Sequence, residues 1–251
     1  KAAGKKFIAV FISDFEDTDE EYNPEYYLAK YLALKKGIPT QFVTRDVLSS
    51  KHTLKWSIAN IALQIFSKLG GFPWVVRTRN EKCLIVGLGQ AHERNEDKTI
   101  RKFFSYTVLT ESNGLYRDLE ILGESESEDH YSNSFKSRLF EVLKKEIDNY
   151  DKFVIHTPFN LRKKELNSLR DILKGLSDEN KQKEFVAIKL NDNDKFFGYS
   201  EKSNSKVPYE STLIELSYEE FLIWFEGLQF GNPNVTKRYG RPTHIKFIYP
   251  F

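Results

Sequence analysis

The chain has 251 residues, of which 40% are hydrophobic and 29% charged, so it can fold around a hydrophobic core. Its net charge of +2 excludes nucleic-acid binding by bulk charge, and any such binding must use local basic patches. A single cysteine, Cys83, excludes a disulfide framework and a cysteine-based zinc site and favours a cytoplasmic location, and no apolar run has the length of about 20 residues that a membrane span needs.

The first 76 residues predict strands and helices in alternation. Asn23 and Pro24 are a helix-start signal, and Gly37 is typical of a helix end. A longer amphipathic pattern stops at Gly70 and Gly71. The predicted elements are a buried strand at residues 6–12, a helix from Pro24, a strand at residues 41–44 and a helix at residues 53–69. This alternation indicates a Rossmann-like α/β layer.

Beyond residue 76 the predicted order changes to three strands followed by helix, strand, helix and strand. Ser112, Asn113 and Gly114 form the turn of a hairpin. We expect the strand at residues 185–190 to pair with one at residues 196–199. The remaining predicted strands are residues 83–88, 103–110, 115–122, 152–156, 212–216, 221–225 and 244–249, and the predicted helices are residues 134–150 and 161–176. This order is that of an RNase H-like fold.

Polar residues of the first part have the chemistry of a phosphate-binding site. Tyr26 and Lys30 are four residues apart on one predicted helix, as are Gln64 and Lys68 on the other, so each pair shares a helix face. Together with Gln41 they offer ammonium groups, an amide and an aromatic ring on which a base can stack. Spacing alone leaves open the alternative that both lysines are ordinary solvent-exposed helix residues.

Residues 26–74 resemble the MID domain of Argonaute proteins. The resemblance rests on residues 26–30 (YYLAK), residues 37–41 (GIPTQ) and residues 60–71 (NIALQIFSKLGG). The last block is similar to the Argonaute signature N-x-x-L-K/Q-I-N-x-K-L-G-G, from which it departs at Phe66, where many members have asparagine. The resemblance implies that a guide strand's 5′-phosphate is bound by Tyr26, Lys30, Gln41 and Lys68, and that Gln64 helps to hold a divalent cation, Mg²⁺ or Mn²⁺, on that phosphate.

The strand order after residue 76 is similar to that of the Argonaute PIWI domain, which is RNase H-like. We therefore expect a MID domain at residues 1–76 and a PIWI domain at residues 77–251. The chain contains no methionine, even at position 1, although translation starts with one. We therefore expect that the sequence is a fragment or lacks residues, and that the first domain is incomplete at its N-terminus. Whether the second domain is complete at its C-terminus is left open.

The metal-holding carboxylates of cleaving Argonautes have no counterpart at the matching positions. The family pattern I-V-G-I-D corresponds to residues 85–89 (IVGLG), which puts Gly89 at the first aspartate. The pattern H-R-D-G corresponds to residues 156–159, which puts Pro158 or Phe159 at the second. Since two-metal cleavage needs carboxylates around two cations, we expect no catalytic residue and no cleavage.

One group of carboxylates leaves an alternative open. Asp97, Glu93 and Glu111 lie near the first position in sequence and could rebuild a metal site, which would give an active guide-directed endonuclease with unusual ligands. Three histidines are expected to be packing residues: His92, His156 and His244.

Two local basic patches are candidates for contact with a nucleic-acid backbone. Arg162 and Lys163 begin a predicted helix, where they are equally well explained as solvent-exposed residues. Lys237, Arg238 and Arg241 lie in an acid-free segment with a tyrosine and a glycine, which suits backbone contact and stacking. Residues 232–247 also resemble the tail of short prokaryotic Argonautes.

The resemblance implies a catalytically inactive short Argonaute. Such a protein would anchor a 5′-phosphorylated guide and present it to a complementary target, with an APAZ-containing effector carrying a sirtuin-like, TIR or nuclease domain as partner and no membrane association. The alternatives are the active endonuclease and an unrelated α/β phosphate-binding enzyme. The sequence leaves open whether guide and target are RNA or DNA.

Overall fold

The structure is a computed structural model that describes residues 6–14, 24–79, 82–97, 99–158, 161–192, 195–201, 206–228 and 241–250. Two compact units make up the chain, Lys1–Val75 and Val76–Phe251. No helix among the described residues is long and apolar enough to cross a membrane.

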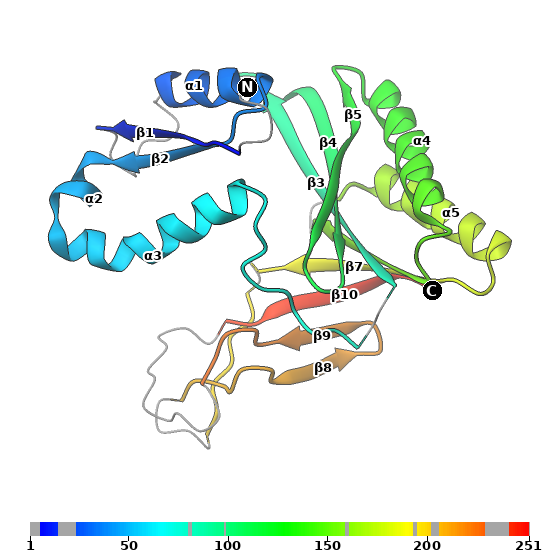
Figure 1. Cartoon of the computed structure of the whole chain (residues 1–251). Coiled ribbons are helices and arrows are strands. Elements are labelled where there is room, and N and C mark those ends of the chain that lie inside the picture. Colours follow the sequence, from blue (N-terminus) through cyan, green and yellow to red (C-terminus); the bar gives the residue numbers. More distant parts are fainter. Residues whose placement is uncertain are drawn as a thin grey trace. The chain divides into compact units, whose positions relative to one another are not determined.

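The first unit is a small α/β layer. Its two strands run parallel and pair from Ala9 with Thr40 to Ser13 with Thr44. Helices α1 and α3 lie on opposite sides of this pair of strands (Figure 1). The elements are β1 (Ala9–Ser13), α1 (Pro24–Lys35), β2 (Thr40–Thr44), α2 (Arg45–Ser49) and α3 (Lys51–Lys68).

Glycine ends both long helices of the first unit in the same way. After α1, Gly37 has a φ of 62°, and the N–H groups of Gly37 and Ile38 donate to the carbonyls of Leu34 and Ala33. After α3, Gly70 has a φ of 85°, and the corresponding bonds close the last turn. Because L-residues avoid this left-handed conformation, these glycines determine where each helix stops.

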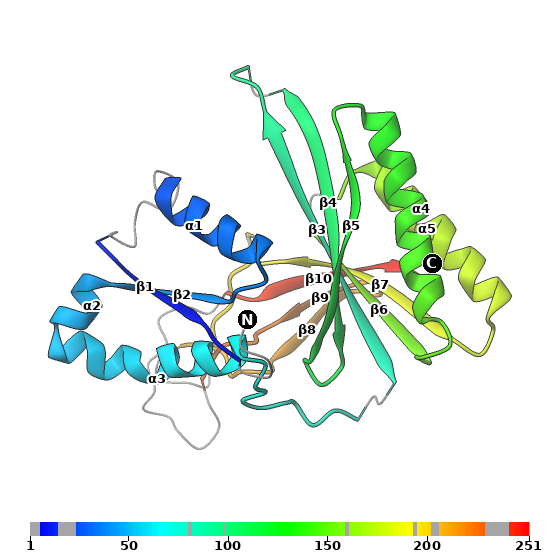
Figure 2. The same ribbon diagram turned by 45° about the horizontal axis from the view of Figure 1, so that its top comes forward.

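The second unit is built on one mixed sheet of eight strands. Its order is β5-β4-β3-β6-β7-β10-β9-β8. Figure 2 shows that the direction of the strands turns strongly between β5 and β10. The strands are β3 (Cys83–Arg94), β4 (Ile100–Glu111), β5 (Tyr116–Ser125), β6 (Lys152–Pro158), β7 (Glu184–Asn191), β8 (Leu213–Ser217), β9 (Glu220–Ile223) and β10 (Thr243–Tyr249). Three antiparallel strands, then helix, strand, helix and strand, match the order expected for an RNase H-like fold.

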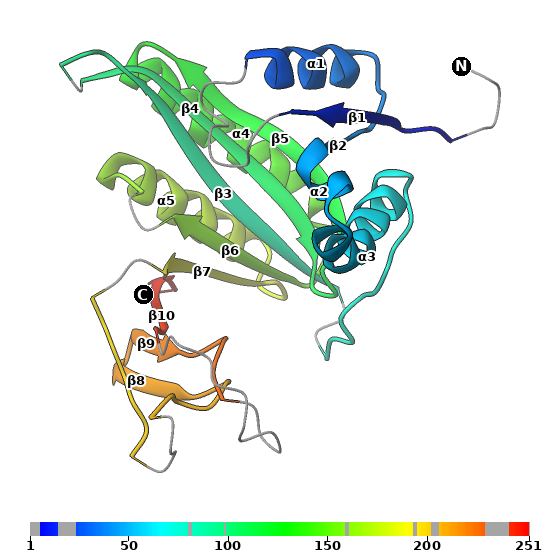
Figure 3. The same cartoon turned by 90° about the vertical axis from the view of Figure 1, so that its left-hand side faces the viewer.

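Two helices cover one face of this sheet. Helices α4 (Glu128–Glu146) and α5 (Lys163–Glu179) pack against each other and against the strands (Figure 3). The core between them contains Leu84, Val86 and Leu88 of β3. Since side chains alternate along a strand, the residues between these three, including Gly87, and also Gly89, belong to the opposite face.

Three details differ from the expectations. The predicted pairing of residues 185–190 with residues 196–199 is wrong, because β7 pairs with β6 and, antiparallel, with the distant β10. The first strand is shorter than predicted and largely exposed rather than buried. The short helix α2 has no counterpart among the predicted elements, since its five residues are too few to give a periodic pattern.

Candidate functional site

The four residues expected to bind a phosphate come from three elements of the first unit. Tyr26 and Lys30 lie one turn apart on α1, and the Lys30 ammonium group donates a hydrogen bond of 2.9 Å to the Tyr26 hydroxyl. Lys68 is the last residue of α3, and its ammonium group donates a 2.7 Å bond to the side-chain oxygen of Gln41 on β2. Lys30 therefore pairs with Tyr26, and Lys68 with Gln41.

Phe42 and Gln41 join the two pairs. The Phe42 ring lies 4.5 Å from the Tyr26 ring, centroid to centroid. Gln41 is buried, and its amide nitrogen donates a 2.9 Å bond to the Phe42 carbonyl. This bond fixes the amide orientation, so the side-chain oxygen of Gln41 faces Lys68.

The two lysines form an electropositive cluster with Tyr26 and Gln41. Partial burial, and then the nearby charge of Lys30, lower the pKa of Lys68 below its ordinary value. Neither lysine forms an ion pair with a residue that the structure describes. Tyr26 is in the first turn of α1, where the helix dipole also favours an anion. A bound dianion would relieve the repulsion between the lysines.

The region around Gln64 offers few ligands to a metal ion. Gln64 is exposed and precedes Lys68 by one turn of α3. Within the described ranges, no group of three acidic, histidine or cysteine residues could hold a cation. An amide oxygen is a suitable Mg²⁺ ligand, so Gln64 fits a cation only if phosphate oxygens complete its coordination. The assignment of Gln64 stays a prediction.

Phe66 has a packing role. A Cβ atom added to Gly71 would come within 2.4 Å of the Phe66 ring. The second glycine of the signature therefore lets the chain pass close to this ring, while the first, Gly70, supplies the turn.

At the expected catalytic positions of the second unit, the described residues bring no carboxylates together. Gly89 lies on β3 opposite Tyr106 of β4, and Pro158 ends β6. The three alternative carboxylates each have other partners. Asp97 accepts hydrogen bonds from Thr99, which lower its pKa, Glu93 lies 3.0 Å from Arg101, and Glu111 lies 3.4 Å from Arg117.

The histidines near these positions are packed against neighbours. Burial lowers the pKa of His156, which is therefore a neutral imidazole at pH 7. His92 makes an edge-to-face contact with Phe103, at 5.6 Å between ring centroids. His244 lies 3.6 Å from Glu220.

The first basic patch is partly neutralised. The Arg162 guanidinium lies 3.2 Å from Glu128 and stacks over Phe103 at 4.9 Å. Lys163 is exposed. Of the second patch, Arg241 is exposed, whereas Lys237 and Arg238 lie outside the described residues.

Sequence reasoning missed a buried carboxylate. Glu165 is 2% exposed and accepts bonds from the Tyr131 hydroxyl at 2.6 Å, the Gln90 amide at 2.5 Å and the Arg162 backbone N–H at 2.9 Å. Burial, and then this bond to Glu165, raise the pKa of Tyr131 to about 12, so its hydroxyl remains a donor. Glu165 follows three basic residues and looks solvent-exposed in the sequence, so no local signal marks it as a buried group.

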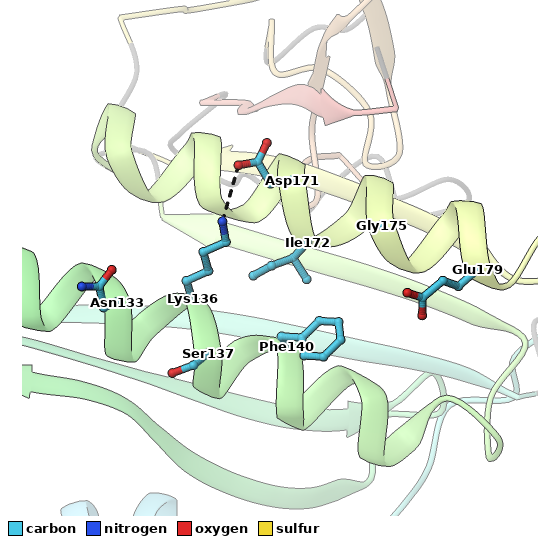
Figure 4. Close-up of a pocket in the computed structure, with 8 residues that line it drawn as sticks. All are labelled: Asn133, Lys136, Ser137, Phe140, Asp171, Ile172, Gly175 and Glu179. Atoms are coloured by element: carbon cyan, nitrogen blue, oxygen red, sulfur yellow. Dashed lines mark ion pairs between the residues drawn. The ribbon is translucent and has the colours of Figure 1, made fainter.

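Among the described residues, one cavity adjoins groups named above and another lies apart from them. One of about 430 Å³ adjoins the ends of β3 and β6 and is lined in part by Arg94, Pro158 and Arg162. The other is a groove between α4 and α5, where Phe140 and Ile172 lie between the helices and Lys136 pairs with Asp171 at 3.7 Å (Figure 4).

Comparison with known proteins identifies the family. The Piwi domain family matches residues 7–248. The chain is 27% identical over 216 residues to a Piwi protein of Archaeoglobus fulgidus, covering 81% of this chain and 49% of that protein. It is 29% identical over 144 residues to a protein argonaute of Cereibacter sphaeroides, covering 55% of this chain and 18% of that protein.

Solved structures agree on the fold. The crystal structure of Aa-Ago with externally bound siRNA superposes with a TM-score of 0.64 at 15% identity, over 98% of this chain and 33% of that one. The A. aeolicus Argonaute structure gives a TM-score of 0.60 at 16% identity, over 90% and 32%. The chain thus spans about half of the Archaeoglobus relative and a third of these Argonautes. By the family match over nearly its whole length, the chain belongs to the Piwi domain family of Argonaute and Piwi proteins.

Proposed function

We propose that this chain anchors the 5′-phosphate of a guide strand and presents the strand for pairing with a complementary target, without cutting it. The supporting observation is the cluster of Tyr26, Lys30, Gln41 and Lys68, which we propose as the phosphate pocket. Partial burial, and then the charge of Lys30, lower the pKa of Lys68, and neither lysine has a carboxylate partner among the described residues. A terminal phosphate carries up to two negative charges, so it matches two adjacent cations.

Each residue of the pocket has a distinct role in this proposal. Lys30 and Lys68 donate charge-assisted hydrogen bonds to the phosphate oxygens. The Gln41 amide holds the Lys68 ammonium group in place through their 2.7 Å bond. Tyr26 offers its hydroxyl to the phosphate and its ring to the first base, and such stacking stabilises a strand by about 1–3 kcal/mol per base.

A divalent cation, Mg²⁺ or Mn²⁺, would add positive charge beside the same phosphate. Gln64 is one turn from Lys68 and supplies the kind of oxygen ligand that such cations accept. Because the described residues around it provide no carboxylate cluster, we propose that this cation binds together with the guide and not before it.

The Lys68 ammonium group is the contact to test. Lys68→Ala should weaken binding of a 5′-phosphorylated guide by about 1.5–3 kcal/mol, the contribution of a hydrogen bond to a charged group. Fluorescence anisotropy with 5′-phosphorylated and 5′-hydroxyl guides measures this loss. It should nearly vanish for the hydroxyl guide, which has no terminal phosphate.

Lys55→Ala is the matched control, since Lys55 is an exposed lysine of the same helix. It should leave both affinities unchanged. If Lys68→Ala lost the same affinity for both guides, a contact between Lys68 and the terminal phosphate would be contradicted. A wild-type protein without preference for the phosphorylated guide would favour an unrelated α/β phosphate-binding enzyme.

The absence of cleavage is a second prediction. Cleavage through two metal ions needs carboxylates that hold cations about 3.5–4 Å apart, and Gly89 and Pro158 offer none. The guide-loaded protein should therefore leave a matched target intact in Mg²⁺ or Mn²⁺, as read on a denaturing gel. Cutting at one defined phosphodiester that is lost on mutation of Asp97 or Glu111 would instead establish the active endonuclease.

Two further parts of the proposal rest on the sequence. The resemblance to short Argonautes implies an APAZ-containing effector partner with a sirtuin-like, TIR or nuclease domain, and the single cysteine favours a cytoplasmic location. Co-expression with such an effector followed by size-exclusion chromatography tests the first. Separate elution of the two proteins, with and without guide and target, would contradict it.

A further inference from the structure

The ring of Tyr106 fills the space beside Gly89. The two residues are direct partners in the β3–β4 ladder. A Cβ atom built on Gly89 would lie 2.2 Å from the Tyr106 ring carbon that bears the hydroxyl, and 2.6 Å from the hydroxyl oxygen. The position expected to carry a metal-holding carboxylate is thus occupied by a phenol from the neighbouring strand.

On β3, this close approach occurs at Gly89 and not at Gly87. Gly87 lies two residues earlier on the same strand and the same face, yet its added Cβ would meet only the Val108 carbonyl oxygen, at 3.7 Å. That distance is an ordinary van der Waals contact. A larger residue at position 89 would therefore have to displace the Tyr106 ring, whereas the sheet backbone leaves room for a side chain at position 87.

Three residues near Tyr106 and Gly89 carry no charge. The tilted Phe104 ring lies 6.0 Å away, and Ile121 pairs with Tyr106 from β5 and is half exposed. His156, the partner of Gly87 on β6, is neutral at pH 7. The Tyr106 hydroxyl forms no hydrogen bond with any residue that the structure describes, so its O–H is free to donate outward.

We propose that Tyr106 binds a backbone phosphate of the paired nucleic acid at the place where a cleaving enzyme would hold its cations. The phenol O–H donates to a phosphodiester oxygen, and the ring packs against the adjacent sugar. A neutral donor stabilises the bound strand without activating water or a leaving group. This contact rests on the proposed function and extends it, since it makes duplex binding at this site independent of divalent cations.

The test measures affinity for a preformed guide–target duplex with 5′-hydroxyl ends, which bypasses the 5′-phosphate pocket. Tyr106→Phe, which keeps the ring, should bind this duplex about tenfold more weakly, equally in Mg²⁺ and in EDTA. Gly89→Ala, which displaces the ring, should give a similar loss. The double variant should lose no more than either single one, because both remove the same contact.

Gly87→Ala is the matched control and should bind like the wild type. Unchanged affinity of Tyr106→Phe, additive losses in the double variant, or no duplex binding by the wild type would each overturn the proposal. Because Gly89→Ala could also destabilise the sheet, Tyr106→Phe carries the decision. If the wild type bound 5′-phosphorylated and 5′-hydroxyl guides equally well, the proposed phosphate pocket would be contradicted. The duplex affinities of the Tyr106 variants would still decide the role of Tyr106.

Discussion

At the scale of single residues, the proposed function makes Lys68 the link between the electrostatics of the first unit and ligand binding. Burial and the charge of Lys30 disfavour its protonated form, and the Gln41 oxygen compensates only in part. The same repulsion that lowers its pKa makes the pocket attractive to an anion. A residue in an ordinary helical position thereby gains a specific chemical role from a neighbour 38 positions away in the sequence.

The lowered pKa of Lys68 makes stability depend on pH. Since this pKa is lowered in the folded chain, the unfolded chain binds more protons between that lowered value and about 10.5. The contribution of Lys68 to stability should therefore increase as the pH rises through this interval. Thermal unfolding of the wild type and Lys68→Gln across alkaline pH measures the difference.

The glutamine variant lacks the titrating group, so subtracting its curve removes the contribution of other residues. Tyr131 needs this correction, since its raised pKa lowers stability over a similar range. If the stability difference between the wild type and Lys68→Gln stays constant or falls as the pH rises, the lowered pKa of Lys68 is contradicted. Inorganic phosphate should reduce the difference, because it offsets the charge of the pocket.

At the scale of elements, the position of Lys68 depends on how α3 ends. Gly70 adopts a left-handed conformation and lets the following N–H groups bond back to the last turn. A longer helix would continue past this point and direct residues 69–71 elsewhere. The two glycines after the helix therefore help to place Lys68 in the proposed phosphate site, although neither offers a side chain to it.

Two glycine substitutions should act in opposite directions. Gly70→Ala should destabilise the protein by about 1–2 kcal/mol, the cost of a left-handed conformation for an L-residue. Gly175→Ala should stabilise it by about 0.5–1 kcal/mol, because Gly175 lies within α5, where an added Cβ has open space. Urea denaturation of both variants measures these changes, and destabilisation by the Gly175 variant would contradict the helical geometry.

At the scale of the whole molecule, the near balance of charge determines how a nucleic acid can be held. With 38 basic and 36 acidic residues, long-range attraction is small, and binding must come from local groups. Several basic residues of the second unit are already paired with acids, among them Arg162 with Glu128 and Lys164 with Asp129. Because these residues are already paired, we expect contact with the nucleic-acid backbone at the acid-free segment that contains Lys237, Arg238 and Arg241.

Neutralising Lys237, Arg238 and Arg241 together should weaken binding of every guide sequence to the same degree. It should also flatten the salt dependence by about 0.7–0.9 units of log–log slope for each phosphate that the variant no longer neutralises. Titrations at several salt concentrations measure the slope. An unchanged slope would indicate that this segment faces solvent or a protein partner, and the 5′-phosphate preference should survive in either case.

Local patterns in the sequence determined much of this molecule. Helical periodicity and the stop signals at Gly37 and Gly70 predicted α1 and α3, because such signals act within a few residues. Alternating strand and helix patterns predicted the α/β class. The residues expected to bind phosphate were chosen by resemblance and spacing. The structure places Lys30 beside Tyr26 and Lys68 beside Gln41, and their binding of a phosphate stays a prediction.

Only the tertiary structure decided what depends on contacts between distant segments. On one side β7 pairs with β10, which lies more than 50 residues further along the chain, and no local pattern distinguishes it from the nearer apolar residues 196–199. Glu165 is buried because Tyr131 and Gln90 reach it from two other elements. Gly89 in the sequence is only a missing carboxylate, and the register of β3 on β4 makes it the position over which Tyr106 lies. Strand register and side-chain partners are set by packing across the whole unit, so neighbouring residues in the sequence cannot specify them.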